Sequence, residues 1–276
     1  MKNVLIPVDF SEISFAAARY AAGLVSQLHS ETIVLYHSYA EVLRDTGFVN
    51  TDEQEQEACM SKLVFMKKRL QKLIPSDVNI ELFCDKKTVK KGIQQILKER
   101  TVSFIVMGVS GLEHLDRDDR ALGKHTRDIM SIKEVPLLVV PRFVKFRPVT
   151  KVALSTDLKG IDDNFPTVHI RKIVEQLHAE LEIIYVNLPQ NKLEGEEKQK
   201  ASEALKIYLQ GINYSFQILE SEDDVPHSVL DFVQQSNSDL LVLVSKDYNF
   251  FNRLFHHSVS KRVLEETHIP VFIARE

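Results

Sequence analysis

The 276-residue sequence lacks features that would assign it to several classes of protein. It has only two cysteines, Cys59 and Cys84, which are too few for the disulfide framework of a small secreted domain. Neither cysteine has a sequence neighbour that would lower its pKa. We therefore expect two free, unreactive thiols in a reducing compartment.

Long apolar runs and strong charge are also missing. No run approaches the ~20 apolar residues that a helix needs to span a bilayer, and the apolar part of MKNVLIPVDF is too short for a signal peptide. The net charge is −4, and no long basic stripe is present. We expect a cytoplasmic protein that binds neither membranes nor nucleic acid.

What the sequence does contain is a regular alternation of strand and helix patterns. Hydrophobic residues make up 44% of the chain and charged residues 27%, which is typical of soluble globular domains. Such alternation predicts an α/β fold with a mostly parallel, doubly wound sheet. In the first half, strands are expected near 3–10, 31–39, 78–85, 103–109 and 135–141, with helices near 12–28, 52–73, 88–100 and 120–134.

The second half repeats this order about 148 residues later, which indicates a tandem duplication. KVALSTDL matches NVLIPVDF, so that Asp157 corresponds to Asp9, and HIPVFIARE matches EVPLLVVPR. A short basic segment, RFVKFRPV, separates the halves. We predict two domains, residues 1–143 and 149–276, each with a five-stranded sheet.

Three glycines follow the fourth strand of the first half: Gly108, Gly111 and Gly123. Glycine lets the backbone approach an anion closely, and a helix start offers N–H groups to phosphate oxygens. The alternative is a turn that needs positive φ. Since the second half has Val244 and other non-glycine residues at the matching places, the turn can be made without glycine. This contrast favours a phosphate site in the first half and a degenerate site in the second.

Two segments resemble the universal stress protein family. NVLIPVDFSEISFAAARYAAGLV is similar to the family's first strand, aspartate and helix, and the fourth strand leading into Gly-x-x-Gly, a helix and VPLLVV is similar to its closing half. The resemblance covers both halves. It implies a Rossmann-like domain of the adenine nucleotide alpha hydrolase type, and two such domains pairing through their last strands. Here they would form an intrachain pseudo-dimer, in a monomer or a homodimer.

The resemblance also implies a nucleotide site, because many members of the family bind ATP while others do not. The residues it assigns to that site come from the ends of three strands and from the glycine segment: Pro7, Val8, Asp9, Ser38, Met107, Gly108, Gly111, Gly123, Lys124, His125 and Thr126. Asp9 would lie near the ribose and phosphates or hold Mg²⁺, and Ser38 near the adenine. No other metal site is expected.

Two departures from the family pattern concern the phosphates. The loop between Gly111 and Gly123 is two residues longer than in the family's ATP binders, and Lys124 stands where those have a hydroxyl residue. A lysine at a helix N-terminus opposes the helix dipole by roughly 0.3–1 kcal/mol. A bound anion would offset this cost; the alternative is that Lys124 simply extends into water.

The sequence thus predicts a stress-response binding module with an adenine nucleotide, ATP or another, in its first half and an unknown protein partner. An alternative is an interaction scaffold without nucleotide, whose glycine segment is a remnant. A third is a nucleotide-dependent enzyme. We expect no fast catalysis, because no motif positions a base; slow ATP hydrolysis at Asp9 with Mg²⁺ stays open.

Overall fold

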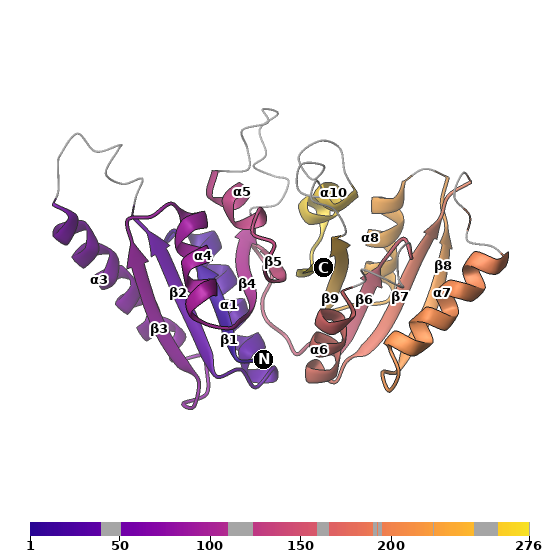
Figure 1. The fold of residues 1–276 in the computed structure, drawn as a ribbon, viewed down its shortest axis with the longest axis horizontal. Coiled ribbons are helices and arrows are strands. Elements are labelled where there is room, and N and C mark those ends of the chain that lie inside the picture. Colours follow the sequence, from indigo (N-terminus) through magenta and orange to yellow (C-terminus); the bar gives the residue numbers. More distant parts are fainter. Residues whose placement is uncertain are drawn as a thin grey trace. The chain divides into compact units, whose positions relative to one another are not determined.

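The chain divides into two compact units, residues 1–146 (unit 1) and 147–276 (unit 2), in the computed structural model of Figure 1. The structure describes residues 1–39, 51–109, 124–158, 166–189, 192, 195–222, 224–245 and 259–275, with only the backbone described at 124, 125, 245, 259–261 and 265. The division falls inside the basic segment RFVKFRPV. Within the described ranges, no helix is long and apolar enough to cross a membrane.

Unit 1 alternates strands and helices along the chain, and its five strands form a parallel sheet in the order β3-β2-β1-β4-β5. Its elements are β1 (Asn3–Pro7), α1 (Glu12–Gln27), β2 (Thr32–Ser38), α3 (Asp52–Leu70), β3 (Asn79–Asp85), α4 (Val89–Glu99), β4 (Val102–Val109), α5 (Lys124–Met130) and β5 (Leu137–Pro141).

Helices cover both faces of this sheet (Figure 1). α1 packs on β4 and β5 and contacts α3, which covers β3, whereas α4 packs on β2 and contacts α5. A strand covered on both faces is apolar throughout, as β1 is: Val4, Leu5 and Ile6 are completely buried. The predicted doubly wound α/β fold is therefore confirmed for unit 1.

Helix α3 shows how local sequence sets an element's limits. It begins after Thr51, where Thr51 and Gln54 form a capping box, and its first turn is acidic while its last turn is basic, which suits the helix dipole. Its inward stripe includes Cys59, Leu63, Met66 and Leu70. The sequence predicted a helix as far as Leu73, but α3 ends at Leu70 and the chain turns before Pro75.

Unit 2 has the same architecture, with parallel strands in the order β10-β9-β6-β7-β8. Helices α8 and α10 pack side by side, as α4 and α5 do in unit 1. Its elements are β6 (Lys151–Ser155), α6 (Thr167–Leu177), β7 (Glu180–Asn187), α7 (Gly195–Tyr208), β8 (Tyr214–Glu220), α8 (Val225–Gln235), β9 (Leu240–Ser245), α10 (Val259–Glu266) and β10 (Val271–Arg275).

Candidate functional site

The strand order of unit 1 reverses between β1 and β4. From β1 the chain moves outward to β2 and β3, then returns to the other side of β1 with β4 and β5. In open parallel sheets, ligands bind outside the carboxyl ends of the strands at such a switch point. Asp9 follows β1 and Gly108 is the penultimate residue of β4, so the fold brings these two predicted residues to the switch point.

Asp9 is exposed at this edge and is held by the start of α1. The Ser11 N–H donates to Asp9 Oδ1 at 2.9 Å, and Ser11 in turn caps α1 by accepting from the Ser14 N–H at 3.1 Å. Partial burial raises the pKa of the Asp9 carboxyl, but hydrogen bonds from Ser11 and Ser14 outweigh it, and the net pKa lies below the usual value. Asp9 is therefore a carboxylate at neutral pH.

Phe10 was not among the residues predicted for the site. Its φ is +64°, in the left-handed region that a bulky residue seldom adopts. This conformation sets its ring 4.4 Å from the His37 ring, and Lys62 Nζ of α3 lies 5.5 Å from the Phe10 ring centroid. No pattern in the sequence signals a left-handed phenylalanine, because local propensity disfavours it. The site thus has an aromatic and cationic border beside Asp9.

The end of β2 is fastened to its neighbours by two side chains. His37 Nδ1 lies 2.6 Å from the Val8 carbonyl oxygen, which can only accept, so Nδ1 carries the proton. Ser38 is buried, and its hydroxyl donates to the Lys87 carbonyl oxygen. Ser38 therefore holds the loop before α4 against β2. That contact engages the hydroxyl that was predicted to lie near an adenine.

Gly108 is required by packing within unit 1. A Cβ at this position would lie 2.6 Å from the Ile13 carbonyl oxygen and 2.7 Å from Ile13 Cγ2. The first turn of α1 therefore passes directly over the end of β4, and only glycine leaves room for it. This contact explains the glycine without any ligand, and it also brings the α1 N-terminus to the switch point.

The other predicted site residues are described to different extents. Pro7, Val8 and Met107 are buried at the ends of β1 and β4. Gly111 and Gly123 lie outside the described residues. Lys124 and His125 begin α5 with only their backbone described, and Thr126 is partly exposed one position further on.

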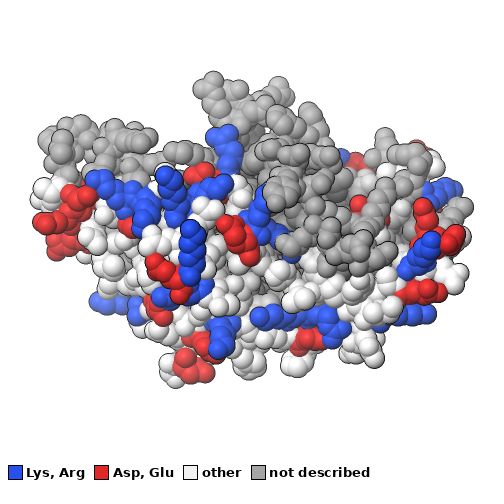
Figure 2. Space-filling view, viewed as in Figure 1, with Lys and Arg blue, Asp and Glu red and all other residues white. Residues whose placement is uncertain are grey.

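Basic side chains gather over the start of α4 on the face of unit 1 shown in Figure 2. Lys86 and Lys87 precede the helix, and Lys90 and Lys91 lie in its first turn. Two of them are paired: Lys86 with Asp52 at 2.8 Å and Lys87 with Asp85 at 3.3 Å. Because α4 follows β3, this cluster lies at the same carboxyl edge of the sheet as Asp9.

In unit 2, the segment after β6, which corresponds to the segment after β1 in unit 1, has a different structure. Asp157 follows β6, and Leu158 repeats the left-handed backbone of Phe10 with a φ of +57°. However, α6 begins at Thr167, ten positions after Asp157, whereas α1 begins three positions after Asp9. Among the described residues, the next helix N-terminus after Asp157 is therefore that of α6. The buried Tyr185 stands at the place of His37, and burial and the nearby Asp157 raise its pKa.

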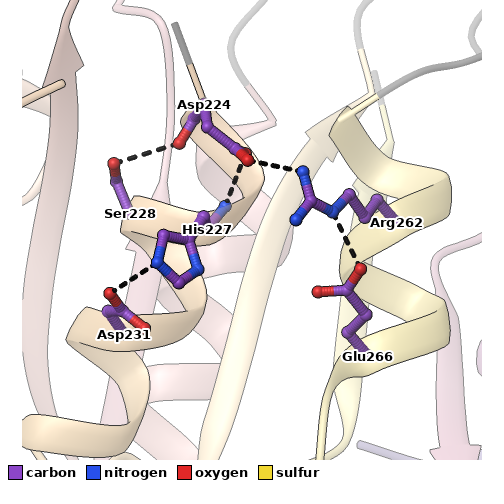
Figure 3. Close-up of polar contacts among 6 residues, drawn as sticks. All are labelled: Asp224, His227, Ser228, Asp231, Arg262 and Glu266. Atoms are coloured by element: carbon purple, nitrogen blue, oxygen red, sulfur yellow. Dashed lines mark hydrogen bonds and ion pairs between the residues drawn. The ribbon is translucent and has the colours of Figure 1, made fainter. Parts of the chain in front are cut away.

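An ion-pair cluster ties α10 to the start of α8 in unit 2 (Figure 3). Asp224 caps α8 by accepting from the His227 N–H at 3.0 Å, and it also binds Arg262 of α10 at 2.5 Å. Arg262 further pairs with Glu266 at 2.8 Å, and His227 with Asp231 at 3.2 Å. Arg262 is thus engaged by two carboxylates, which leaves it poorly placed to neutralise an anion.

Metal-binding groups do not cluster in the part of the chain that the structure describes: no three His, Cys, Asp or Glu side chains converge there. Asp9 could still supply one carboxylate to a Mg²⁺ ion, because Mg²⁺ is commonly held by one or two carboxylates together with substrate phosphates. The exposed, ionised state of Asp9 fits that role.

Comparisons with known proteins agree with this architecture. The model of the universal stress protein family matches residues 1–141 and 168–275. No curated protein sequence matches. A crystal structure of a universal stress protein from Archaeoglobus fulgidus is similar over 99% of this chain and 98% of its own, with a TM-score of 0.73 and 19% identity.

Two further solved structures have the same fold. A functionally unknown protein from Pseudomonas aeruginosa matches 99% of this chain and 92% of its own, with a TM-score of 0.56 and 12% identity. The cytoplasmic domain of a prokaryotic cation chloride cotransporter matches 99% and 95%, with a TM-score of 0.56 and 11% identity. At such identities the likeness shows a shared fold, and a fold alone does not specify a function.

Proposed function

This chain belongs to the universal stress protein family, whose model matches both of its halves, and on that basis we propose that it is a stress-response module that binds one adenine nucleotide. The site would be the carboxyl edge of β2, β1 and β4 in unit 1. Unit 2 would carry no nucleotide. Binding would alter a surface for a protein partner.

The strand order is the observation that carries this proposal. Asp9 follows β1 and Gly108 lies on β4, the two strands that flank the switch point of unit 1, which is where α/β sheets of this kind take their ligands. The N-terminus of the sixteen-residue helix α1 lies at the same point, and a helix N-terminus favours negative charge. A phosphorylated ligand suits these surroundings.

Charge near the site supports a phosphate-bearing ligand with Mg²⁺. Asp9 is ionised and exposed, so it can bind the ribose hydroxyls or a Mg²⁺ ion that accompanies the phosphates. Lys62, whose Nζ lies 5.5 Å from the Phe10 ring centroid, and the lysines at the start of α4 add positive charge at the same edge of the sheet. We propose binding without fast hydrolysis.

The asymmetry between the units supports a single site. In unit 2 the first described helix after Asp157 is α6, which starts ten positions later, whereas α1 starts three positions after Asp9, and Tyr185 fills the place of His37. The described part of unit 2 therefore places no helix N-terminus as near to Asp157 in the sequence as that of α1 is to Asp9. Unit 2 would serve as a structural partner.

A second candidate is a scaffold without nucleotide, and the packing of Gly108 favours it. Because Ile13 alone explains why residue 108 is glycine, this glycine need not be kept for phosphate. In this alternative the carboxyl edge of unit 1 would bind a protein rather than a nucleotide. Both candidates keep the same fold, so a binding measurement separates them.

The duplication provides a matched pair of variants for that measurement. Asp9→Asn and Asp157→Asn make the same change at corresponding places of the duplication, and thermal unfolding of each variant checks that it is folded. Titrations of the whole chain with ATP and with AMP, each with and without Mg²⁺, are followed by calorimetry. Loss of hydrogen bonds to a charged group costs about 1.5–3 kcal/mol, so Asp9→Asn should weaken binding by roughly 10- to 100-fold.

The outcomes are distinct. Weaker binding in Asp9→Asn, with wild-type affinity in Asp157→Asn, is the expected result. Equal losses in both variants would contradict a site confined to unit 1. No heat and no thermal shift at millimolar nucleotide in the wild type would favour the scaffold.

A further inference from the structure

The two cysteines of the chain meet in unit 1, although 24 residues separate them in the sequence. Cys59 lies on the inward stripe of α3, between Glu55 and Leu63, and is 4% exposed. Cys84 lies near the end of β3, the edge strand that α3 covers. Since side chains alternate along a strand, Cys84 shares the face of β3 that carries Ile80 and Leu82.

Hydrogen bonds place the Cys84 sulfur against the turn of α3 that contains Cys59. Cys84 Sγ lies 3.8 Å from the carbonyl oxygen of Gln56, three positions before Cys59 on the same helix. The Cys59 thiol in turn donates a hydrogen bond to the Cys84 sulfur. The two thiols therefore face each other where α3 packs on β3.

The two thiols differ in access to solvent. Cys59 is buried, whereas Cys84 is partly exposed, so a small oxidant in solution reaches Cys84 first. Burial raises the pKa of both thiols, and the hydrogen bond that Cys59 donates raises its own pKa further. A high pKa keeps the thiolate fraction small, so the pair reacts slowly and stays reduced in a reducing compartment.

We propose that Cys59 and Cys84 form a reversible intramolecular disulfide that fastens α3 to the edge strand β3. The oxidant is hydrogen peroxide. The Cys84 thiolate attacks the peroxide oxygen, the O–O bond breaks, and Cys84 becomes a sulfenic acid while the leaving oxygen departs as water after taking up a proton. The Cys59 sulfur then attacks the Cys84 sulfur and a second water leaves. Two thiols and one peroxide give one disulfide and two waters.

The disulfide would lie close to the carboxyl edge of the sheet. Cys84 is the register partner of His37 on β2, and His37 contacts the Phe10 ring beside Asp9. The linkage would close the chain from Cys59 to Cys84, which includes the second half of α3 and nearly all of β3. It therefore constrains the border of the candidate site without using any residue assigned to ligand binding.

The test oxidises the reduced whole chain with hydrogen peroxide, alkylates the remaining thiols and digests the protein without reductant. In the wild type we expect a linked peptide pair containing Cys59 and Cys84, a monomeric chain that has lost two hydrogen atoms, and full recovery of both thiols with dithiothreitol. In Cys59→Ala, Cys84 has no resolving thiol, so it should accumulate sulfenic and sulfinic acid instead. Cys59→Ser serves as a second variant if alanine impairs folding.

Thermal unfolding gives a second readout. A disulfide that closes a loop of this length should raise the Tm of the oxidised wild type by roughly 5 °C or more, and Cys84→Ser should show no such rise after the same treatment. The proposal would be overturned if Cys84 of the wild type formed as much sulfenic and sulfinic acid as it does in Cys59→Ala. It would also be overturned if disulfides formed only between chains. A third contradicting result would be that both thiols can still be alkylated in a sample in which the peroxide has already oxidised Met60.

Discussion

Replacing Gly108 by alanine would place a methyl carbon 2.6 Å from the Ile13 carbonyl oxygen and 2.7 Å from Ile13 Cγ2. Both distances are far below van der Waals contact, and the oxygen belongs to the backbone of the first turn of α1, so it cannot move alone. Extra atoms forced into a packed interior cost about 1–3 kcal/mol. Alanine would otherwise be favoured over glycine inside a strand by roughly 0.5–1 kcal/mol.

The difference predicts that Gly108→Ala destabilises unit 1 by about 1–2 kcal/mol. For a unit of this size, that corresponds to a fall in Tm of roughly 2–8 °C. Thermal unfolding measures the loss, and native-state hydrogen exchange locates it, because amide protection should fall at the end of β4 and in the first turn of α1 while unit 2 is unchanged.

Ile13→Ala tests the cause of the loss. It removes Cγ2, one of the two clashing atoms, so Gly108→Ala should cost less in the Ile13→Ala background than in the wild type. Strictly additive effects would refute the steric reasoning. Gly108→Ala with wild-type stability but lost nucleotide binding would show instead that the glycine serves the ligand.

Two further predictions concern stability. A Cβ at Gly92 would lie 1.8 Å from the Tyr36 hydroxyl oxygen, so Gly92→Ala should lower the free energy of unfolding in urea by roughly 1–3 kcal/mol. The loss should be smaller in a Tyr36→Phe background, which by itself loses only about 1 kcal/mol with the hydrogen bond to Asp85. Additive losses would contradict this. Burial, reinforced by Lys172, lowers the pKa of His169 despite its hydrogen bond to the Arg275 carbonyl. The unfolded state then binds the proton more tightly, so unit 2 should lose stability as the pH falls below about 6.5 toward the lowered folded value. In His169→Asn, which keeps a hydrogen-bond donor, the urea concentration at the unfolding midpoint should vary less with pH between about pH 7.5 and pH 5 than in the wild type. The same pH dependence as in the wild type would contradict the role given to His169.

The fold was predictable because its signals are local. The continuous apolar run at Val4 to Ile6 and the N-cap Ser11 define β1 and the start of α1 from a few neighbouring residues. Repetition of that run at Val152 to Leu154 then indicated the second unit. The placement of Asp9 at the carboxyl edge follows from the same local pattern.

The details of the site depend on contacts between distant segments, so the sequence did not reveal them. Ile13 and Gly108 are 95 positions apart, and nothing in either segment indicates that a backbone oxygen of one excludes a Cβ from the other. Cys59 and Cys84 have unremarkable neighbours in the sequence, yet the packing of α3 on β3 brings the two thiols to the same helix–strand interface. Phe10 adopts its left-handed backbone against its own propensity.

The stoichiometry of nucleotide binding tests the central claim most directly. Equilibrium dialysis of the whole chain with radiolabelled ATP and Mg²⁺, carried to saturation, counts the sites without reference to any variant. A single adenine nucleotide in unit 1 predicts one nucleotide bound per chain. Two nucleotides per chain would show that unit 2 also binds, and none at millimolar ATP would contradict the nucleotide site altogether.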